Sequence, residues 1–146
     1  MKKTESDEGK TILVTMKADH YRYMAEITHG DQFSNYKHHA LEFYKEAYMK
    51  SLLLPKLNKI RLGTCLNYSV FYFEVMSDPI IALKIATEAL DDALKELKTV
   101  SDDNLEDENM QDSLKIIDVI KMNVNEWFIE VEKEENKDFK KDDYKK

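Results

Sequence analysis

The sequence predicts an all-α fold of antiparallel stacked helical hairpins. Only three Gly and two Pro occur among 146 residues, so the chain has few residues that break helices or form tight turns. Apolar residues recur at helical spacing in five segments, and no segment shows the long alternation of a half-buried strand. The length is that of one ordinary domain. A helical bundle with short connections follows from these observations.

The first two predicted helices cover residues 9–29 and 34–53. Gly30 and Asp31 separate them, because glycine commonly follows the last turn of a helix. Pro55 ends the second helix, since the residue before a proline disfavours the α region. Short connections of this kind favour antiparallel neighbours.

The third and fourth predicted helices cover residues 58–76 and 79–98. Asp78 and Pro79 mark the start of the fourth helix, with aspartate as the N-cap and proline at the first helical position. Small side chains share one stripe of this helix and permit close approach of a neighbour: Ala82, Ala86, Ala89 and Ala93. The stripe indicates packing rather than chemistry.

The last predicted helix covers residues 105–132. Both ends of the chain mix charges of either sign with little apolar content, a composition typical of solvated segments. We therefore expect a disordered leader over residues 1–8, a domain over 9–132 and a disordered charged tail over 133–146.

The composition argues against several classes of function. The formal net charge is −7, from 22 Lys and Arg against 29 Asp and Glu, which disfavours binding to nucleic acid. No apolar run has the length of a membrane span or a signal peptide. The single cysteine, Cys65, cannot form an internal disulfide. We expect a soluble protein of the cytoplasm that binds neither nucleic acid nor membrane.

The third predicted helix is apolar almost all round but carries a narrow polar stripe. Asn67 and Glu74 lie about two turns apart on one face, with Val70 between them. The stripe could simply face solvent. It could also line a binding surface.

The last predicted helix has a similar interruption. Asn123 lies on a stripe with Ile116, Ile120 and Trp127, and Val119 lies beside it. A buried amide needs hydrogen-bond partners, which a neighbouring carbonyl could supply. Alternatively, an asparagine on each of two helices could bond the N–H and C=O groups of an extended peptide.

The first predicted helix places a guanidinium beside a phenol, at Arg22 and Tyr23. Such a pair can bind phosphate through charge-assisted hydrogen bonds. Asp19 and Glu26 stand one helical turn away on either side, so Arg22 could instead form an ordinary helix ion pair.

Three ordered stretches closely resemble 14-3-3 proteins. These are residues 16–26 (MKADHYRYMAE), residues 60–74 (IRLGTCLNYSVFYFE) and residues 112–127 (DSLKIIDVIKMNVNEW). The likeness runs from about residue 5 to residue 130 and corresponds to the last five of the family's nine helices.

The resemblance implies a non-enzymatic adaptor without a cofactor, which binds phosphoserine or phosphothreonine peptides of client proteins. By position, Arg22 and Tyr23 would bind the phosphate, and Asn67 and Asn123 would hold the peptide backbone. Glu74 and Trp127 would bond near the peptide main chain, and the four aliphatic residues among those given next would form an apolar wall. These peptide-binding residues would be Leu66, Asn67, Val70, Glu74, Ile116, Val119, Asn123 and Trp127.

The sequence also departs from the family pattern. The family's first four helices have no counterpart, nor do the lysine and second arginine of its phosphate pocket or the helices through which it dimerises. Thr15 stands where the family usually has lysine, and Lys115 replaces a leucine of the groove. The loop after Val100 is longer by about four residues. We therefore expect a partial domain that lacks the family's dimer interface.

Two other functions stay open. Glu26 and His29 have the Glu-x-x-His spacing of a carboxylate-bridged di-iron enzyme, but such a site needs a second copy on another helix, and the sequence contains none. Cys65 lacks an evident activating base for nucleophilic catalysis. A helical scaffold could also use Asn67 and Asn123 to bind peptides without recognising a phosphate group.

Overall fold

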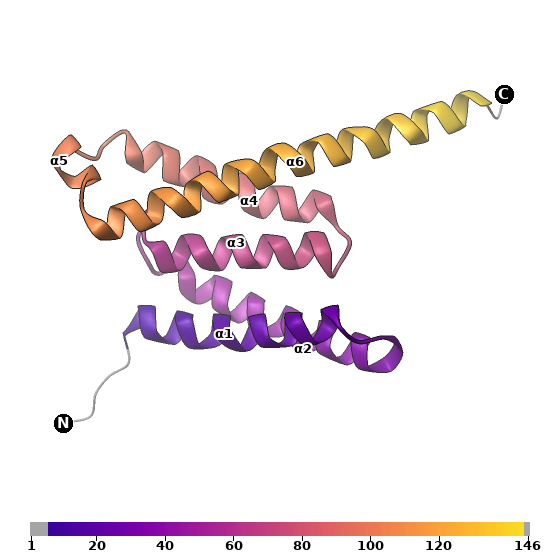
Figure 1. The fold of residues 1–146 in the computed structure, drawn as a ribbon, viewed down its shortest axis with the longest axis horizontal. Coiled ribbons are helices and arrows are strands. Elements are labelled where there is room, and N and C mark those ends of the chain that lie inside the picture. The colour runs from indigo at the N-terminus through magenta and orange to yellow at the C-terminus, as the bar shows by residue number, and fades with distance from the viewer. Residues whose placement is uncertain (1–5, 145–146) are drawn as a thin grey trace.

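The computed structural model describes residues 6–144, and within them it contains helices and no strand. The helices are α1 (Asp7–Glu26), α2 (Gly30–Ser51), α3 (Lys59–Glu74), α4 (Pro79–Leu97), α5 (Asp102–Leu105) and α6 (Glu108–Tyr144). They stack in layers, with α1 and α2 at one side, α3 in the middle, and α4 and α6 at the other (Figure 1). The prediction of an all-α fold is confirmed.

Helix α3 occupies the centre of this stack. It packs against α1 and α2 on one side and against α4 and α6 on the other. Among the described residues, α1 and α6 do not contact each other. Any ligand bound between those two helices would therefore lie over α3.

Side-chain caps fix the start of three helices. Ser6 accepts a hydrogen bond from the Gly9 N–H at the start of α1. Asn58 accepts from the Ile60 N–H before α3, and Asp78 accepts from the Ile81 N–H before α4. Each cap satisfies an N–H group that has no partner within its helix.

The connection between α1 and α2 is shorter than the sequence predicted. We expected α2 to begin at residue 34, whereas it begins at Gly30, which has a φ of +62°. Glycine adopts this left-handed conformation without a steric penalty, so the chain can reverse at this residue and resume the helix at once.

The core is formed by large side chains from α2, α3 and α6 and by the small-residue stripe of α4. Ala82, Ala86 and Ala93 of that stripe are buried and Ala89 is half-buried, which agrees with the predicted packing role. The fully buried large side chains at the centre are Tyr44, Leu62, Phe71, Ile117 and Ile120.

Both ends of the helical region differ from the predicted boundaries. Helix α1 starts at Asp7, and residues 1–5 of the expected leader lie outside the described residues. Helix α6 continues to Tyr144, so residues 133–144 are helical where we predicted a disordered tail. Residues 108–144 contain no Gly or Pro and bring opposite charges one turn apart, such as Glu130 and Lys133 at 4.0 Å.

No helix within residues 6–144 is both long enough and apolar enough to cross a membrane.

Candidate functional site

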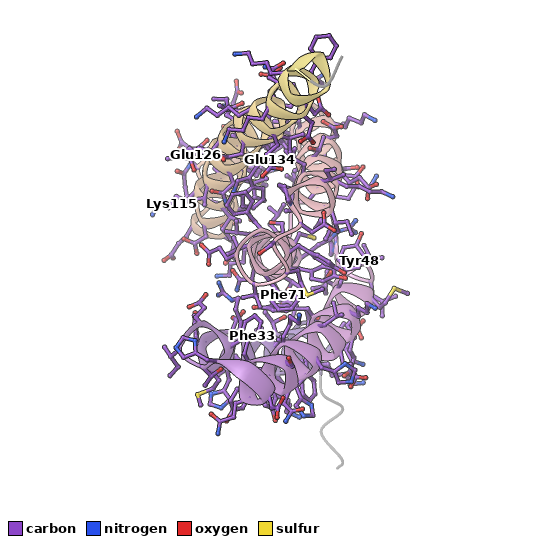
Figure 2. The ribbon with its side chains drawn as sticks, turned by 90° about the vertical axis from the view of Figure 1, so that its right-hand side faces the viewer. Phe33, Tyr48, Phe71, Lys115, Glu126 and Glu134 are labelled. Atoms are coloured by element: carbon purple, nitrogen blue, oxygen red, sulfur yellow. The ribbon has the colours of Figure 1, made fainter. Side chains whose placement is uncertain are left out.

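The predicted site residues come from α1, α3 and α6, that is, from the central helix and one neighbour on each side of it. Figure 2 looks along the helices and shows Phe71 of α3 between Phe33 of α2 below and α6 above. Because α3 separates α1 from α6, side chains on its half-buried face can lie between groups contributed by the other two helices.

Arg22 is held in a fixed position on α1. The residue is only 8% exposed, its Nη2 donates to the Tyr23 hydroxyl at 3.4 Å, and its guanidinium lies 4.8 Å from the centre of the Tyr23 ring. The Nε of Arg22 is buried and has no protein hydrogen-bond partner. The structure thus brings Arg22 and Tyr23 together and leaves the Nε donor unused.

The ion pair expected from helical spacing is also present. Asp19 Oδ1 lies 3.7 Å from Arg22 Nη2. Burial lowers the pKa of Arg22, but the nearby Tyr44 and Asp19 outweigh this effect and leave the pKa raised. Arg22 therefore remains a cation in spite of its enclosure.

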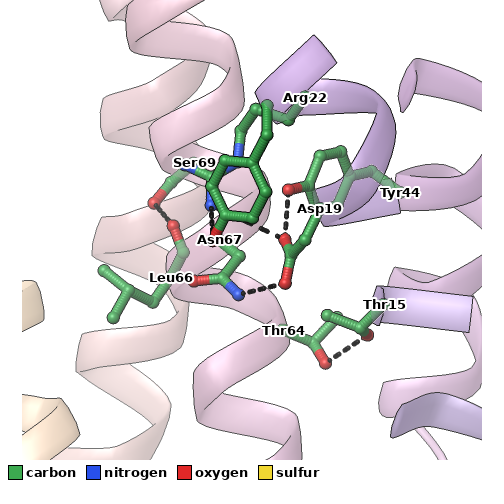
Figure 3. Close-up of polar contacts among 9 residues, drawn as sticks. Thr15, Asp19, Arg22, Tyr44, Thr64, Leu66, Asn67 and Ser69 are labelled. Atoms are coloured by element: carbon green, nitrogen blue, oxygen red, sulfur yellow. Dashed lines mark hydrogen bonds and ion pairs between the residues drawn. The ribbon is translucent and has the colours of Figure 1, made fainter. Parts of the chain in front are cut away.

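Asp19 connects three helices (Figure 3). Tyr44 of α2 donates its hydroxyl hydrogen to Asp19 Oδ1, and Asn67 of α3 donates from Nδ2 to Asp19 Oδ2 at 3.0 Å. Burial raises the pKa of Asp19, while Tyr44, Arg22 and Asn67 act against this rise. The sequence singled out Asp19 only as an ion-pair partner of Arg22 and gave no signal for Tyr44.

The other candidates on α3 lie around Asn67. Leu66, Asn67 and Val70 are half-buried, and Glu74 is exposed. Burial raises the pKa of Glu74, the negative charge of Glu26 raises it further, and Arg22 opposes the rise. Glu74 therefore lies close enough to α1 for the charges of Glu26 and Arg22 to affect its pKa.

The candidates on α6 divide into two kinds. Ile116 and Asn123 are half-buried and Val119 is exposed, so all three retain accessible surface. Trp127 is only 4% exposed, and its ring stacks on Phe73 of α3 with centroids 4.9 Å apart. Trp127 thus joins α6 to α3, and a bond from it to a bound peptide stays a prediction.

Thr15, which stands where the family usually has lysine, does not contribute a charge to this surface. Its hydroxyl lies 3.0 Å from the Thr64 hydroxyl in a buried hydrogen bond between α1 and α3. A shallow recess beside this pair is lined by the apolar side chains of Ile12, Met16 and Ile60 and by the polar side chains of Lys59 and Asn67.

The comparisons with known proteins agree with the three sequence stretches that carry the resemblance. The sequence model of the family described as 14-3-3 protein matches residues 1–128. The chain is 42% identical over 120 residues to the 14-3-3 protein homolog of Encephalitozoon cuniculi, covering 82% of this chain and 45% of that protein.

Two further relatives give the same result. Protein BMH2 of Saccharomyces cerevisiae is 38% identical over 121 residues, which cover 82% of this chain and 42% of that protein. The 14-3-3 protein beta/alpha-B of Xenopus laevis is 36% identical over 130 residues, covering 88% of this chain and 51% of that protein. The chain spans about half the length of these relatives, and it belongs to the 14-3-3 family.

Proposed function

We propose that this chain carries part of the peptide-binding groove of a 14-3-3 adaptor, and that it binds phosphoserine or phosphothreonine segments of client proteins. The observation that supports this most strongly is the state of Arg22. It is an arginine more than nine-tenths buried, and its Nε has no protein partner. The Nε is closed to solvent, so a bound anion would meet the guanidinium through its Nη atoms, beside the exposed Tyr23 hydroxyl.

A phosphate group fits the chemistry of Arg22 and Tyr23. Arginine offers planar N–H donors that match the geometry of phosphate oxygens, and charge-assisted bonds of this kind are stronger than neutral ones. Tyr23 is 55% exposed, so its hydroxyl can meet a ligand that arrives from solvent. Asp19, at 3.7 Å from Nη2, offsets the guanidinium charge without occupying every donor.

The backbone of the peptide would be held by Asn67 and Asn123. Each amide offers an acceptor and two donors, which suits the alternating N–H and C=O groups of an extended chain. The partly exposed apolar residues beside them, on α3 and α6, would contact peptide side chains: Leu66, Val70, Ile116 and Val119. Glu74 and Trp127 would bond near the peptide main chain.

We expect the 146 residues to bind phosphopeptides weakly. They contain Arg22 and Tyr23 but no counterpart of the lysine and second arginine that the family likeness implies. Loss of one partner of a desolvated charge pair costs about 2–5 kcal/mol, and about 1.4 kcal/mol corresponds to tenfold in affinity. Two lost contacts should therefore weaken binding by roughly a thousandfold or more.

A fluorescence-anisotropy titration with one peptide in phosphorylated and unphosphorylated form tests the proposal. Arg22→Ala should abolish the preference for the phosphorylated form, because it removes the buried guanidinium. Asn67→Ala should weaken both forms alike, because the peptide backbone is common to them. Unchanged selectivity in Arg22→Ala would place the phosphate site elsewhere.

A phosphate-independent scaffold is the second candidate, and one observation favours it. Thr15 and Thr64 bond to each other where a family lysine would add positive charge. A chain of this kind would bind both forms of the peptide with equal affinity, and that affinity would still depend on Asn67. The same titration therefore separates the two functions.

A further inference from the structure

A single carboxylate lies between the two residues that the proposed function assigns to different tasks. Asp19 Oδ2 accepts a hydrogen bond from Asn67 Nδ2 at 3.0 Å, and Asp19 Oδ1 lies 3.7 Å from Arg22 Nη2. Tyr44, which is fully buried, donates to the same Oδ1 from the far side. Figure 3 shows these groups as one network that joins α1, α2 and α3.

The chemistry of this network determines how the Asn67 amide is turned. An ionised carboxylate can only accept hydrogen bonds, so Asn67 must direct its NH₂ group toward Asp19. Its carbonyl oxygen is then directed away from Asp19, and its second N–H is not used by this contact. Without a partner that only accepts, the two ends of an amide are similar in shape and either could face inward.

We propose that Asp19 is a positioning residue, which orients the Asn67 amide so that its carbonyl oxygen is free for a peptide N–H and holds Arg22 in the same network. The inference rests on the proposed function, because it explains how the backbone-binding and phosphate-binding groups of that one site are aligned. Burial raises the pKa of Asp19, and the donors Tyr44, Arg22 and Asn67 oppose this rise and favour the accepting form of the carboxylate.

The orientation can be measured without any peptide. In two-dimensional NMR spectra of the complete chain, the Asn67 side-chain amide should show one proton that is shifted downfield and exchanges slowly with water. Asp19→Ala should remove both features. Thr64→Val is the matched control, because it deletes another buried hydrogen bond between α1 and α3, the one to Thr15, and leaves the Asp19–Asn67 contact in place, so it should preserve both features. If Asp19→Ala does not fold, Asp19→Asn serves instead, because two amides can pair in either orientation and should weaken the signal.

The effect on binding is measured by anisotropy with the phosphorylated peptide. Asp19→Ala should weaken binding by about tenfold, the effect of losing one hydrogen bond to a charged group. In an Asn67→Ala background the same change should alter affinity by no more than about twofold, because residues that act through one contact are not additive. Thr64→Val should stay within about twofold of the unmodified chain, and thermal unfolding should show comparable destabilisation by the two single changes.

The outcomes separate this inference from the proposed function. An Asn67 amide signal unchanged by Asp19→Ala, or an equal loss of affinity in both backgrounds, would overturn the role of Asp19 while phosphopeptide binding by the unmodified chain still stands. An unmodified chain that shows the protected amide and binds no phosphopeptide would overturn the proposed function. The oriented amide would then be a feature of folding alone.

Discussion

Arg22 and Cys65 are both enclosed by the helices, yet their surroundings give them opposite chemical behaviour. Arg22 lies beside Asp19 and Tyr44, which keep its pKa raised although burial acts to lower it. Burial raises the pKa of the Cys65 thiol to about 11, and the nearby Arg61 opposes only part of this shift. Arg22 therefore keeps a charge for an anionic ligand, whereas Cys65 stays a neutral thiol.

We predict that Cys65 reacts slowly with a disulfide reagent while the chain is folded. At pH 8, the raised pKa of about 11 leaves about a hundredfold less thiolate than an ordinary thiol would have, and burial restricts access as well. Absorbance measured after adding the reagent at pH 8, with and without denaturant, gives the two rates. Equal rates in the folded and denatured chain would contradict both the burial and the raised pKa of this thiol.

The polar network shows how far local spacing predicts a site. The Asp19–Arg22 ion pair follows from positions one helical turn apart, and the sequence predicted it as an alternative. The bonds from Asn67 and Tyr44 to Asp19 join residues 48 and 25 positions apart. They depend on how α1, α2 and α3 pack, which helical periodicity does not specify. The predicted roles of Asn123 and Trp127 toward a peptide stay predictions.

At the scale of whole elements, α6 combines a segment that packs against other helices with a segment that does not. Its first half lies against α3 and α4, with Ile117 and Ile120 fully buried. Its last part extends beyond the other helices toward the C-terminus (Figure 1). The sequence predicted the first part well, because core residues recur at helical spacing there. It missed the second part, because charged residues without an apolar stripe are also typical of disorder.

We predict that a proline affects these two segments differently. Asp118→Pro, in the part that lies against the bundle, should lower the free energy of unfolding by about 3 kcal/mol or more. Lys137→Pro should reduce helical content with almost no change in the melting temperature. It interrupts backbone hydrogen bonds in a part of α6 that does not pack against the core. Both residues are exposed, so side-chain burial does not differ between the variants. Circular dichroism spectra and melting curves measure both quantities, and an equal loss of melting temperature would show that the extension contributes to the core.

At the scale of the molecule, apolar side chains remain uncovered on α1. Ile12, Leu13 and Met16 are all at least 40% exposed and line one shallow recess with Ser6 and Gly9. Contiguous apolar surface of this kind is unusual on a monomer and promotes association.

We therefore predict that the 146-residue chain associates nonspecifically through this face of α1 and does not form a discrete dimer. Light scattering should give an average mass that rises steadily with protein concentration, and Met16→Glu should reduce the rise by placing a charge in the apolar patch. Met49→Glu is the matched control, because Met49 of α2 is 64% exposed and Met16 is 62% exposed, yet Met49 is not among the residues that line the recess. Neither change should lower the melting temperature much, since both side chains already face water. A dimer mass that is constant across concentrations would contradict the prediction, and loss of that dimer in Met16→Glu alone would identify the α1 face as a specific interface.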